Sequence, residues 1–156
     1  MKSKKNLVFL GMMGSGKSSI GYLVAKKLKL NFIDIDREIE KKLNTTIKKI
    51  FENKGEDYFR KVEEQTTLKK LKLNSSVISL GGGAFINKNI RDEVKKSSVS
   101  IWLDLDVEML YKRIKVNKKR PLLKNASREE LQKIFVEREK TYSKADFRIE
   151  CNFKNK

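Results

Sequence analysis

The feature that most constrains this chain is a glycine-rich loop between an apolar segment and the start of a helix. Residues 11–18, GMMGSGKS, match the pattern Gly-x-x-x-x-Gly-Lys-Ser, and apolar residues 7–10 precede them. Glycines let the backbone turn tightly, so that its amides can surround phosphate oxygens. In such loops the lysine, here Lys17, reaches the β- and γ-phosphates, and the hydroxyl of Ser18 is available to Mg²⁺. A helix that begins near Lys17 adds its positive N-terminal end.

This loop predicts a nucleotide site, and we expect it to bind ATP with Mg²⁺. The residues expected to contact the nucleotide are Gly11, Gly14, Ser15, Gly16, Lys17, Ser18 and Ser19. The loop does not identify the acceptor, because GTPases, ATPases and small-molecule kinases all use it. Residues 117–120 are the nearest match to the Asn-Lys-x-Asp motif of a GTPase, but arginine replaces the aspartate. The long apolar strand ending in Asp that a motor ATPase needs is also missing, which leaves a compact kinase.

Short apolar runs indicate the strands of one parallel sheet. They lie at residues 7–10, 32–33, 77–80, 100–103 and 147–149, without the alternation of a half-exposed strand. Between them, apolar residues recur at helical spacing. Asp106 is expected to cap one helix, and Ser127 with Glu130 forms a capping box for another. Strands that alternate with helices predict a three-layer α/β/α domain around a central parallel five-stranded sheet.

The composition narrows the class of protein. The length of 156 residues suits a single domain. Residues 35–62 and 115–126 are expected to form two excursions from its sheet, and the second of them, which contains Pro121, is a candidate lid. The chain has no histidine, so acid–base chemistry must use other side chains. A single cysteine, Cys151, excludes an internal disulfide and favours a reducing compartment. No signal peptide or spanning segment is evident, so we expect a cytoplasmic protein without a membrane partner.

The formal net charge of +17 has two interpretations. A basic chain can bind nucleic acid, and a nucleotide-dependent nucleic-acid-binding or regulatory module is the alternative from a different class. However, the excess is mostly lysine spread along every segment, with eight arginines and no cluster of arginines and aromatics. A solvated basic surface, which also attracts anionic substrates, is therefore favoured over a specific nucleic-acid site.

Three weaker signals indicate an acceptor site. Asp34 and Asp36 are expected at the carboxyl end of a strand, on the same side of the extended chain, unless Asp36 instead caps a helix that begins at Arg37. Arg60 is expected on a helix with Glu63 and Glu64 at i+3 and i+4, a spacing that also occurs in exposed salt bridges. Residues 81–83, three glycines after a strand, are either a flexible turn or a surface of backbone donors for a ligand.

Together these segments resemble the shikimate kinase family, from about Leu7 to Ile149. The resemblance rests on GMMGSGKSS at 11–19, DID at 34–36, GEDYFRKVE at 55–63, GGG at 81–83, RPLL at 120–123 and the pair Arg138 and Tyr142. It implies transfer of the ATP γ-phosphoryl group to the 3-hydroxyl of shikimate, on the route to chorismate and the aromatic amino acids. It also implies a phosphate-loop core, an acceptor-binding subdomain and a lid.

The resemblance assigns roles on the acceptor side. Asp36 would hold the acceptor hydroxyls and is the candidate base. Arg60 and Arg138 would bind the shikimate carboxylate, and Glu63 would orient Arg60. The backbone donors would come from Gly81, Gly82 and Gly83.

On the donor side, the resemblance implies that Asp34 supports Mg²⁺ together with Ser18. Arg120, in the lid, would close over the phosphates beside Lys17 and stabilise the transferring charge. Arg113 would pack against adenine. Ile35 departs from the family, which often has a small polar residue at that position. Few residues follow the last predicted strand, so we expect the adenine contacts to differ from those of the family. A related gluconate or nucleoside monophosphate kinase is the enzyme alternative, and we expect a monomer.

Overall fold

The computed structural model describes residues 5–116 and 125–152. In this part of the chain five strands form one sheet in the order β2-β3-β1-β4-β5, and every neighbouring pair is parallel. The strands are β1 (Asn6–Leu10), β2 (Asn31–Asp34), β3 (Ser76–Ser79), β4 (Ser98–Asp104) and β5 (Phe147–Glu150). The predicted five-stranded parallel sheet is confirmed.

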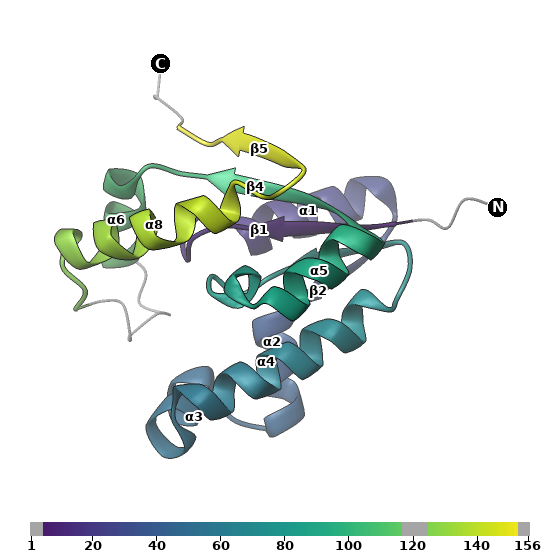
Figure 1. The fold of residues 1–156 in the computed structure, drawn as a ribbon, viewed down its shortest axis with the longest axis horizontal. Coiled ribbons are helices and arrows are strands. Elements are labelled where there is room, and N and C mark those ends of the chain that lie inside the picture. The colour runs from purple at the N-terminus through teal and green to yellow at the C-terminus, as the bar shows by residue number, and fades with distance from the viewer. Residues whose placement is uncertain (1–4, 117–124, 153–156) are drawn as a thin grey trace.

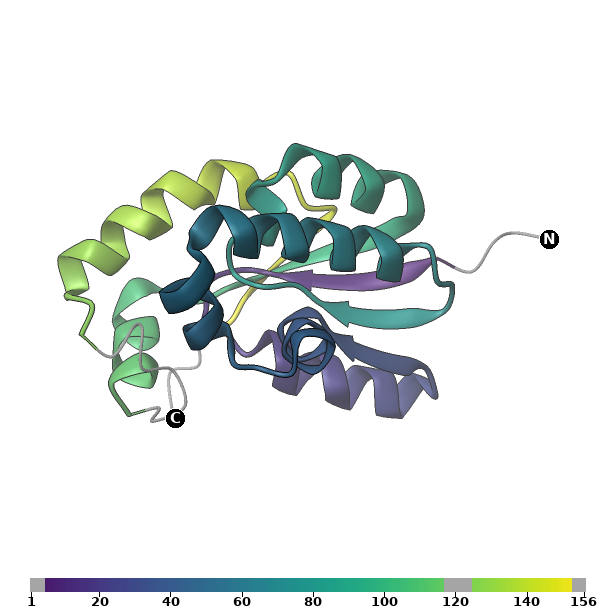
Figure 2. The same ribbon diagram turned by 90° about the horizontal axis from the view of Figure 1, so that it is seen from below.

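Helices cover both faces of this sheet. They are α1 (Lys17–Leu28), α2 (Ile35–Leu43), α3 (Ile47–Lys54), α4 (Glu56–Leu71), the short 3₁₀ helix η1 (Ala84–Ile86), α5 (Lys88–Ser97), α6 (Val107–Val116) and α8 (Arg128–Tyr142). In Figure 1, α5 and α8 lie in front of the sheet, α1 lies behind it, and α2, α3 and α4 lie below it. Figure 2 shows the sheet between α1 and α5, which gives the three layers of the expected α/β/α fold.

The predicted helix caps at Asp106 and Ser127 are present. Asp106 Oδ1 accepts a hydrogen bond from the Met109 amide at 2.8 Å, just before α6. At the start of α8, Ser127 Oγ accepts from the Glu130 amide while the Glu130 carboxylate accepts from the Ser127 amide. These reciprocal bonds satisfy amides that have no partner inside the helix.

The end of β2 differs from the prediction. The strand ends at Asp34 and α2 begins at Ile35, so Asp36 lies in the first helical turn. Asp34 Oδ1 accepts from the amide of Arg37 at 3.2 Å and is therefore the cap of α2. The expectation of two aspartates on one side of an extended strand is wrong, and so is the alternative in which Asp36 caps the helix.

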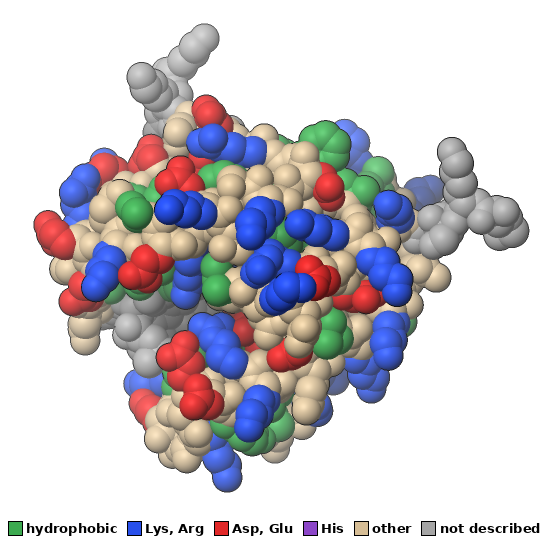
Figure 3. Space-filling model, viewed as in Figure 1, with side chains coloured by type: hydrophobic (Ala, Val, Ile, Leu, Met, Phe, Trp, Pro, Cys, Tyr) green, Lys and Arg blue, Asp and Glu red, His purple; other side chains and the backbone are tan. Residues whose placement is uncertain are grey.

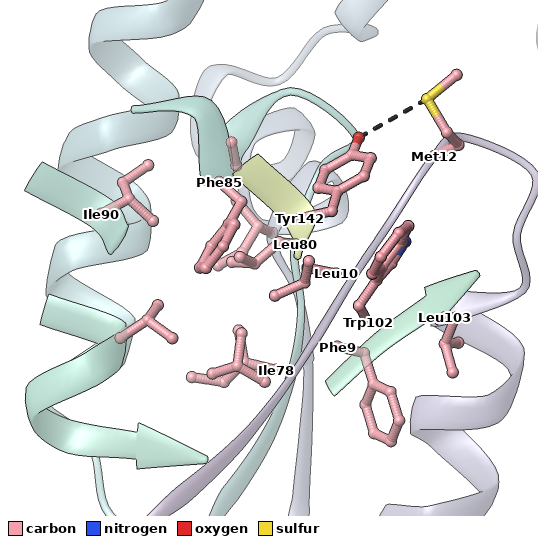
Figure 4. Packing of buried hydrophobic residues seen from close by; sticks show 14 of the residues in the cluster. Phe9, Leu10, Met12, Ile78, Leu80, Phe85, Ile90, Trp102, Leu103 and Tyr142 are labelled. Atoms are coloured by element: carbon pink, nitrogen blue, oxygen red, sulfur yellow. Dashed lines mark hydrogen bonds between the residues drawn. The ribbon is translucent and has the colours of Figure 1, made fainter. Parts of the chain in front are cut away.

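The core lies on both sides of the central strands. Figure 4 labels Tyr142, Trp102, Leu10 and Met12 among the buried residues, and these four side chains are at most 1% exposed. The rings of Tyr142 and Trp102 lie 5.8 Å apart. Apolar side chains from α5 and η1 complete this cluster. The packing brings the end of α8 against the start of the loop that follows β1, although the two are far apart in the sequence.

The surface carries its charge diffusely. Figure 3 shows lysine and arginine side chains over the whole visible face, with acidic side chains among them, rather than one basic patch. Within the described residues, no helix is both long and apolar enough to span a bilayer.

Candidate functional site

The loop after β1 adopts a backbone that requires its glycines. Gly11, Gly14 and Gly16 have φ angles of +140°, +82° and +97°, where side chains are disfavoured. Gly11 also lies against β4, because a Cβ on it would be 2.6 Å from the Leu103 carbonyl oxygen. Gly16 is the N-cap of α1, so the positive end of this helix faces the loop.

The side chain of Lys17, the first residue of α1, lies against the loop. Its Nζ donates to the carbonyl oxygens of Gly11 at 2.9 Å and Met12 at 2.8 Å, and the residue is only 6% exposed. The ammonium group is therefore held beside the amides that would surround phosphate oxygens. A flexible side chain in this place supplies a compact positive charge to phosphates.

A cavity of about 660 Å³ adjoins the loop and has the size of a typical small-molecule site. Its lining residues are Gly14, Gly16, Lys17, Ser18, Ser19, Lys112, Arg113, Ile114 and Val116. Arg113 Nη1 donates to the Gly14 carbonyl at 3.2 Å, which joins α6 to the loop. The Ser15 hydroxyl is buried and has no hydrogen-bond partner among the described residues. Most of the predicted nucleotide residues thus surround one cavity, while Gly11 and Ser15 belong to the loop without lining it.

The predicted magnesium residues lie in contact with each other. Ser18 Oγ donates to Asp34 Oδ2 at 2.5 Å, and Ser79 Oγ lies 3.5 Å from Ser18 Oγ. Mg²⁺ is bound in phosphoryl-transfer enzymes by one or two carboxylates together with substrate phosphates. A carboxylate and a hydroxyl beside the phosphate-binding loop therefore fit this ion. The position of Ser79, at the end of β3, was not predicted.

The three glycines after β3 lie among the predicted acceptor residues. A Cβ on Gly81 would be 2.7 Å from Glu63 Oε1 and 2.9 Å from Asp36 Oδ1. A Cβ on Gly83 would be 2.7 Å from Arg60 Nη1. A side chain at these positions would displace charged groups that approach the backbone closely, whereas φ imposes no such requirement. Side chains from α2 and α4 thus converge on this loop.

Gly82, the middle glycine, faces α8. A Cβ on it would be 3.4 Å from Arg138 Nη1 and 3.2 Å from the Met13 amide nitrogen. Gly82 therefore lies between the phosphate-binding loop and the helix that carries Arg138. Arg138 Nη1 is buried without a hydrogen-bond partner among the described residues, so a donor is available to an anionic ligand.

Arg60 and Glu63 form the ion pair that was predicted from their spacing. Arg60 Nη1 donates to Glu63 Oε2 at 2.8 Å, and Glu63 is only 2% exposed. This burial raises the pKa of Glu63 and the nearby Asp36 carboxylate raises it further, against the opposing effects of Arg60 and Arg138. The pair is therefore not the exposed salt bridge of the alternative interpretation, and Glu63 restrains the guanidinium of Arg60 beside Gly83.

Some predictions fall outside this cluster or outside the described residues. Glu64, expected beside Arg60, instead accepts hydrogen bonds from Asn87 at 2.9 Å and Asn89 at 2.7 Å. Arg120 and most of the predicted lid, 115–126, lie in the undescribed segment 117–124. Tyr142, to which the sequence assigned no role, donates from its hydroxyl to the Gly82 carbonyl oxygen at 2.5 Å. Its position four residues after Arg138 was the only signal in the sequence.

Comparison with known proteins identifies the family. The family model for shikimate kinase matches residues 13–156. The shikimate kinase of Persephonella marina is 41% identical over 151 residues, which are 97% of this chain and 92% of that protein. That of Bartonella quintana is 42% identical over 147 residues, 94% of this chain and 70% of that protein.

The chain belongs to the shikimate kinase family. Among solved structures, the Acinetobacter baumannii shikimate kinase in complex with shikimate matches with a TM-score of 0.91 and 32% identity, covering 96% of this chain and 85% of that one. The Aquifex aeolicus shikimate kinase matches with a TM-score of 0.84 and 36% identity, and the match covers 95% of this chain and 88% of that one. The expected fold and enzyme class, an ATP-dependent phosphotransferase that uses Mg²⁺, are thereby confirmed.

The gluconate kinase alternative is supported only at the level of the fold. A gluconokinase from Sinorhizobium meliloti matches with a TM-score of 0.51 and 16% identity over 85% of this chain and 74% of that one. An identity this low carries no information about the acceptor. The much closer likeness to shikimate kinases therefore decides between the two kinase families.

Proposed function

We propose that this chain performs the reaction of its family, transfer of the ATP γ-phosphoryl group to the 3-hydroxyl of shikimate, with the residues described above. The observation that carries this proposal is the convergence of Asp36, Arg60 and Arg138 on residues 81–83, beside the phosphate-binding loop. A carboxylate that can accept hydroxyl hydrogen bonds and two guanidinium groups suit a small polyhydroxy acid better than a neutral sugar.

On the acceptor side, Arg60 and Arg138 bind the carboxylate of shikimate, since planar guanidinium groups match carboxylate oxygens. Glu63 keeps Arg60 oriented through their 2.8 Å hydrogen bond. Asp36 holds the acceptor hydroxyl and takes its proton as the new O–P bond forms. The amides of residues 81–83 supply further donors.

On the donor side, the amides of the loop and the ammonium of Lys17 bind the ATP phosphates, and Lys17 neutralises charge that develops during transfer. Asp34 and Ser18 would hold Mg²⁺, which would neutralise negative charge on the phosphates. We assign Arg113 to the adenine, because it lines the cavity beside the loop. Arg120, outside the described residues, is proposed to add a second cation from the lid.

The proposal extends to the layout and setting of the enzyme. Residues 35–62, which comprise α2, α3 and the first part of α4, are proposed as the acceptor-binding excursion, and 115–126 as the lid. We propose a cytoplasmic monomer with no specific nucleic-acid partner, consistent with a single cysteine and with the diffuse charge in Figure 3.

An ADP-release assay with ATP and Mg²⁺ tests this function across shikimate, gluconate and nucleoside monophosphates. We expect turnover with shikimate at a kcat/KM at least about a hundredfold above the others, because the anionic groups and hydroxyls of gluconate and of nucleotides are spaced differently and would leave polar groups of the site unpaired. Absence of turnover with shikimate would refute the proposal. ATP-dependent RNA binding that persists at 0.15 M salt, a concentration chosen to screen nonspecific contacts, would favour the nucleic-acid alternative instead.

A further inference from the structure

A tyrosine, Tyr142, is buried at the end of α8, outside the groups assigned to the reaction. We infer that Tyr142 is a positioning residue for the acceptor, whose hydroxyl fixes the orientation of the Gly82–Gly83 peptide. This inference rests on the proposed function of residues 81–83 in shikimate binding. It adds a residue that acts through the glycine loop and determines how well that loop can bind shikimate.

The carbonyl groups of the three glycines differ in their hydrogen-bond partners. The Gly81 carbonyl accepts from the Ala84 amide at 3.1 Å, and the Gly83 carbonyl accepts from the Ile86 amide at 3.2 Å. Both bonds are local turns within the loop itself. The Gly82 carbonyl, by contrast, accepts from the hydroxyl of Tyr142, which is 60 residues away in the sequence.

The hydrogen bond to the Gly82 carbonyl also orients the amide of Gly83. The carbonyl and amide of a trans peptide point in opposite directions, and the described residues contain no cis peptide. When the Gly82 carbonyl points toward Tyr142, the Gly83 amide must therefore point away from it. Gly83 is the glycine beside Arg60, where a Cβ would be 2.7 Å from Nη1. The hydroxyl of Tyr142 thus fixes the direction of a backbone donor that belongs to the residue beside Arg60.

The Tyr142 hydroxyl has a second possible acceptor in the sulfur of Met12. Met12 Sδ lies 3.8 Å from the Tyr142 oxygen, a contact drawn in Figure 4. A phenol has one proton to donate and thioether sulfur is a weak acceptor, so the 2.5 Å bond to Gly82 dominates. Tyr142 is fully buried, and its ring lies 5.8 Å from that of Trp102. The ring is consequently held in place, and its hydroxyl acts as a fixed point for a loop of three flexible glycines.

The helix gives Tyr142 a defined relation to the acceptor site. Arg138 is four residues earlier, on the same face of α8, and its Nη1 would be 3.4 Å from a Cβ on Gly82. One helix face therefore positions the guanidinium beside Gly82 and holds the Gly82 carbonyl. Arg138 also faces the Tyr142 hydroxyl, because its charge opposes the rise that burial causes in the pKa of Tyr142. Loss of the hydroxyl should therefore loosen both the glycine loop and Arg138 without altering the nucleotide cavity.

Tyr142→Phe tests this inference, because it removes one oxygen atom and keeps the ring. Tyr22→Phe is the matched control, since Tyr22 lies on α1 and is 54% exposed. Calorimetric titrations give the Kd and the binding stoichiometry of shikimate and of ATP for each variant. For Tyr142→Phe the Kd of shikimate should rise about threefold to tenfold, the range expected for one lost hydrogen bond. The Kd of ATP should stay unchanged, and the control should change neither.

The outcomes separate positioning from a purely structural role. Incomplete folding lowers the stoichiometry for both ligands and leaves both dissociation constants unchanged, which would overturn the inference, as would an unchanged shikimate Kd. If wild-type protein fails to turn over shikimate in the assay above, the proposed function fails instead. Amide order parameters of wild-type Gly82 and Gly83 without ligand provide a second measurement, independent of any variant: values near 0.85 support a fixed loop, and values below about 0.6 refute it.

Discussion

Replacement of Gly83 by alanine is a direct test of how the acceptor site is built. The φ angle of Gly83 is −97°, so alanine introduces no backbone strain there. The new Cβ would instead lie 2.7 Å from Nη1, 2.8 Å from Nη2 and 2.9 Å from Cζ of Arg60. An unstrained contact needs about 3.4 Å, so the guanidinium must move by about 0.7 Å. The obstacle is the end of a flexible side chain, so we expect the fold to tolerate the change.

The magnitude follows from the role of Arg60. A misplacement of 1 Å at a reacting centre can reduce a rate by about a hundredfold, and one charged hydrogen bond contributes about 1.5–3 kcal/mol. For a shift of about 0.7 Å we expect shikimate KM to rise about tenfold to fiftyfold. The KM of ATP should be unchanged, because the nucleotide cavity does not include Gly83.

Steady-state kinetics on a double-mutant cycle with Arg60→Ala provide the assay. If alanine at position 83 acts by displacing Arg60, it should have no further effect once that side chain is absent. Equal effects of Gly83→Ala in both backgrounds would refute this reasoning. A loss of more than about 2 kcal/mol in the free energy of unfolding would refute the claim that the fold tolerates the change.

Three further variants test other parts of the structure. Lys17→Ala should lower kcat by about a hundredfold to a thousandfold with shikimate binding intact, and an unaffected kcat would remove Lys17 from the mechanism. Asn6→Ala should cost about 2–5 kcal/mol in urea unfolding, because it removes the partner of three backbone groups, two of them in buried hydrogen bonds, while both KM values stay as in wild type. The raised pKa of Glu63 means that its charged form destabilises the fold, so stability due to this group is present at low pH and falls as pH rises through that pKa. Glu63→Gln should abolish this fall in stability, measured as urea midpoints from pH 4 to 8, and should also raise the KM of shikimate. If the variant keeps the wild-type dependence of stability on pH, Glu63 is excluded as the cause of the fall.

The local parts of the site could be predicted from sequence. Each glycine of the phosphate-binding loop was assigned from backbone requirements within a few residues, and the Arg60–Glu63 pair from helical spacing. Both depend on neighbours along the chain. The same holds for the capping box at Ser127, where the pattern of residue types specifies its own hydrogen bonds.

The long-range contacts could not be predicted. The hydrogen bond from Tyr142 to Gly82 spans 60 residues, and the bonds between Asn6 and the chain from the end of α4 to the start of β3 span 65 to 70. Each is made by a polar side chain whose partner is a backbone atom, so no complementary residue type marks it in the sequence. Tertiary packing alone brings these groups together, and the apolar runs that create the packing say nothing about individual polar atoms.

The error at residues 34–36 changes how the two halves of the site are connected. In an extended strand Asp34 and Asp36 would face the same half of the site. In the structure one caps α2 and the other lies in its first turn, and two residues of helix correspond to a rotation of about 200°. Asp34 consequently contacts Ser18 at 2.5 Å while Asp36 lies beside Gly81. Because the order β2-β3-β1 brings the three loops to one edge of the sheet, this single helix start can serve nucleotide and acceptor at once.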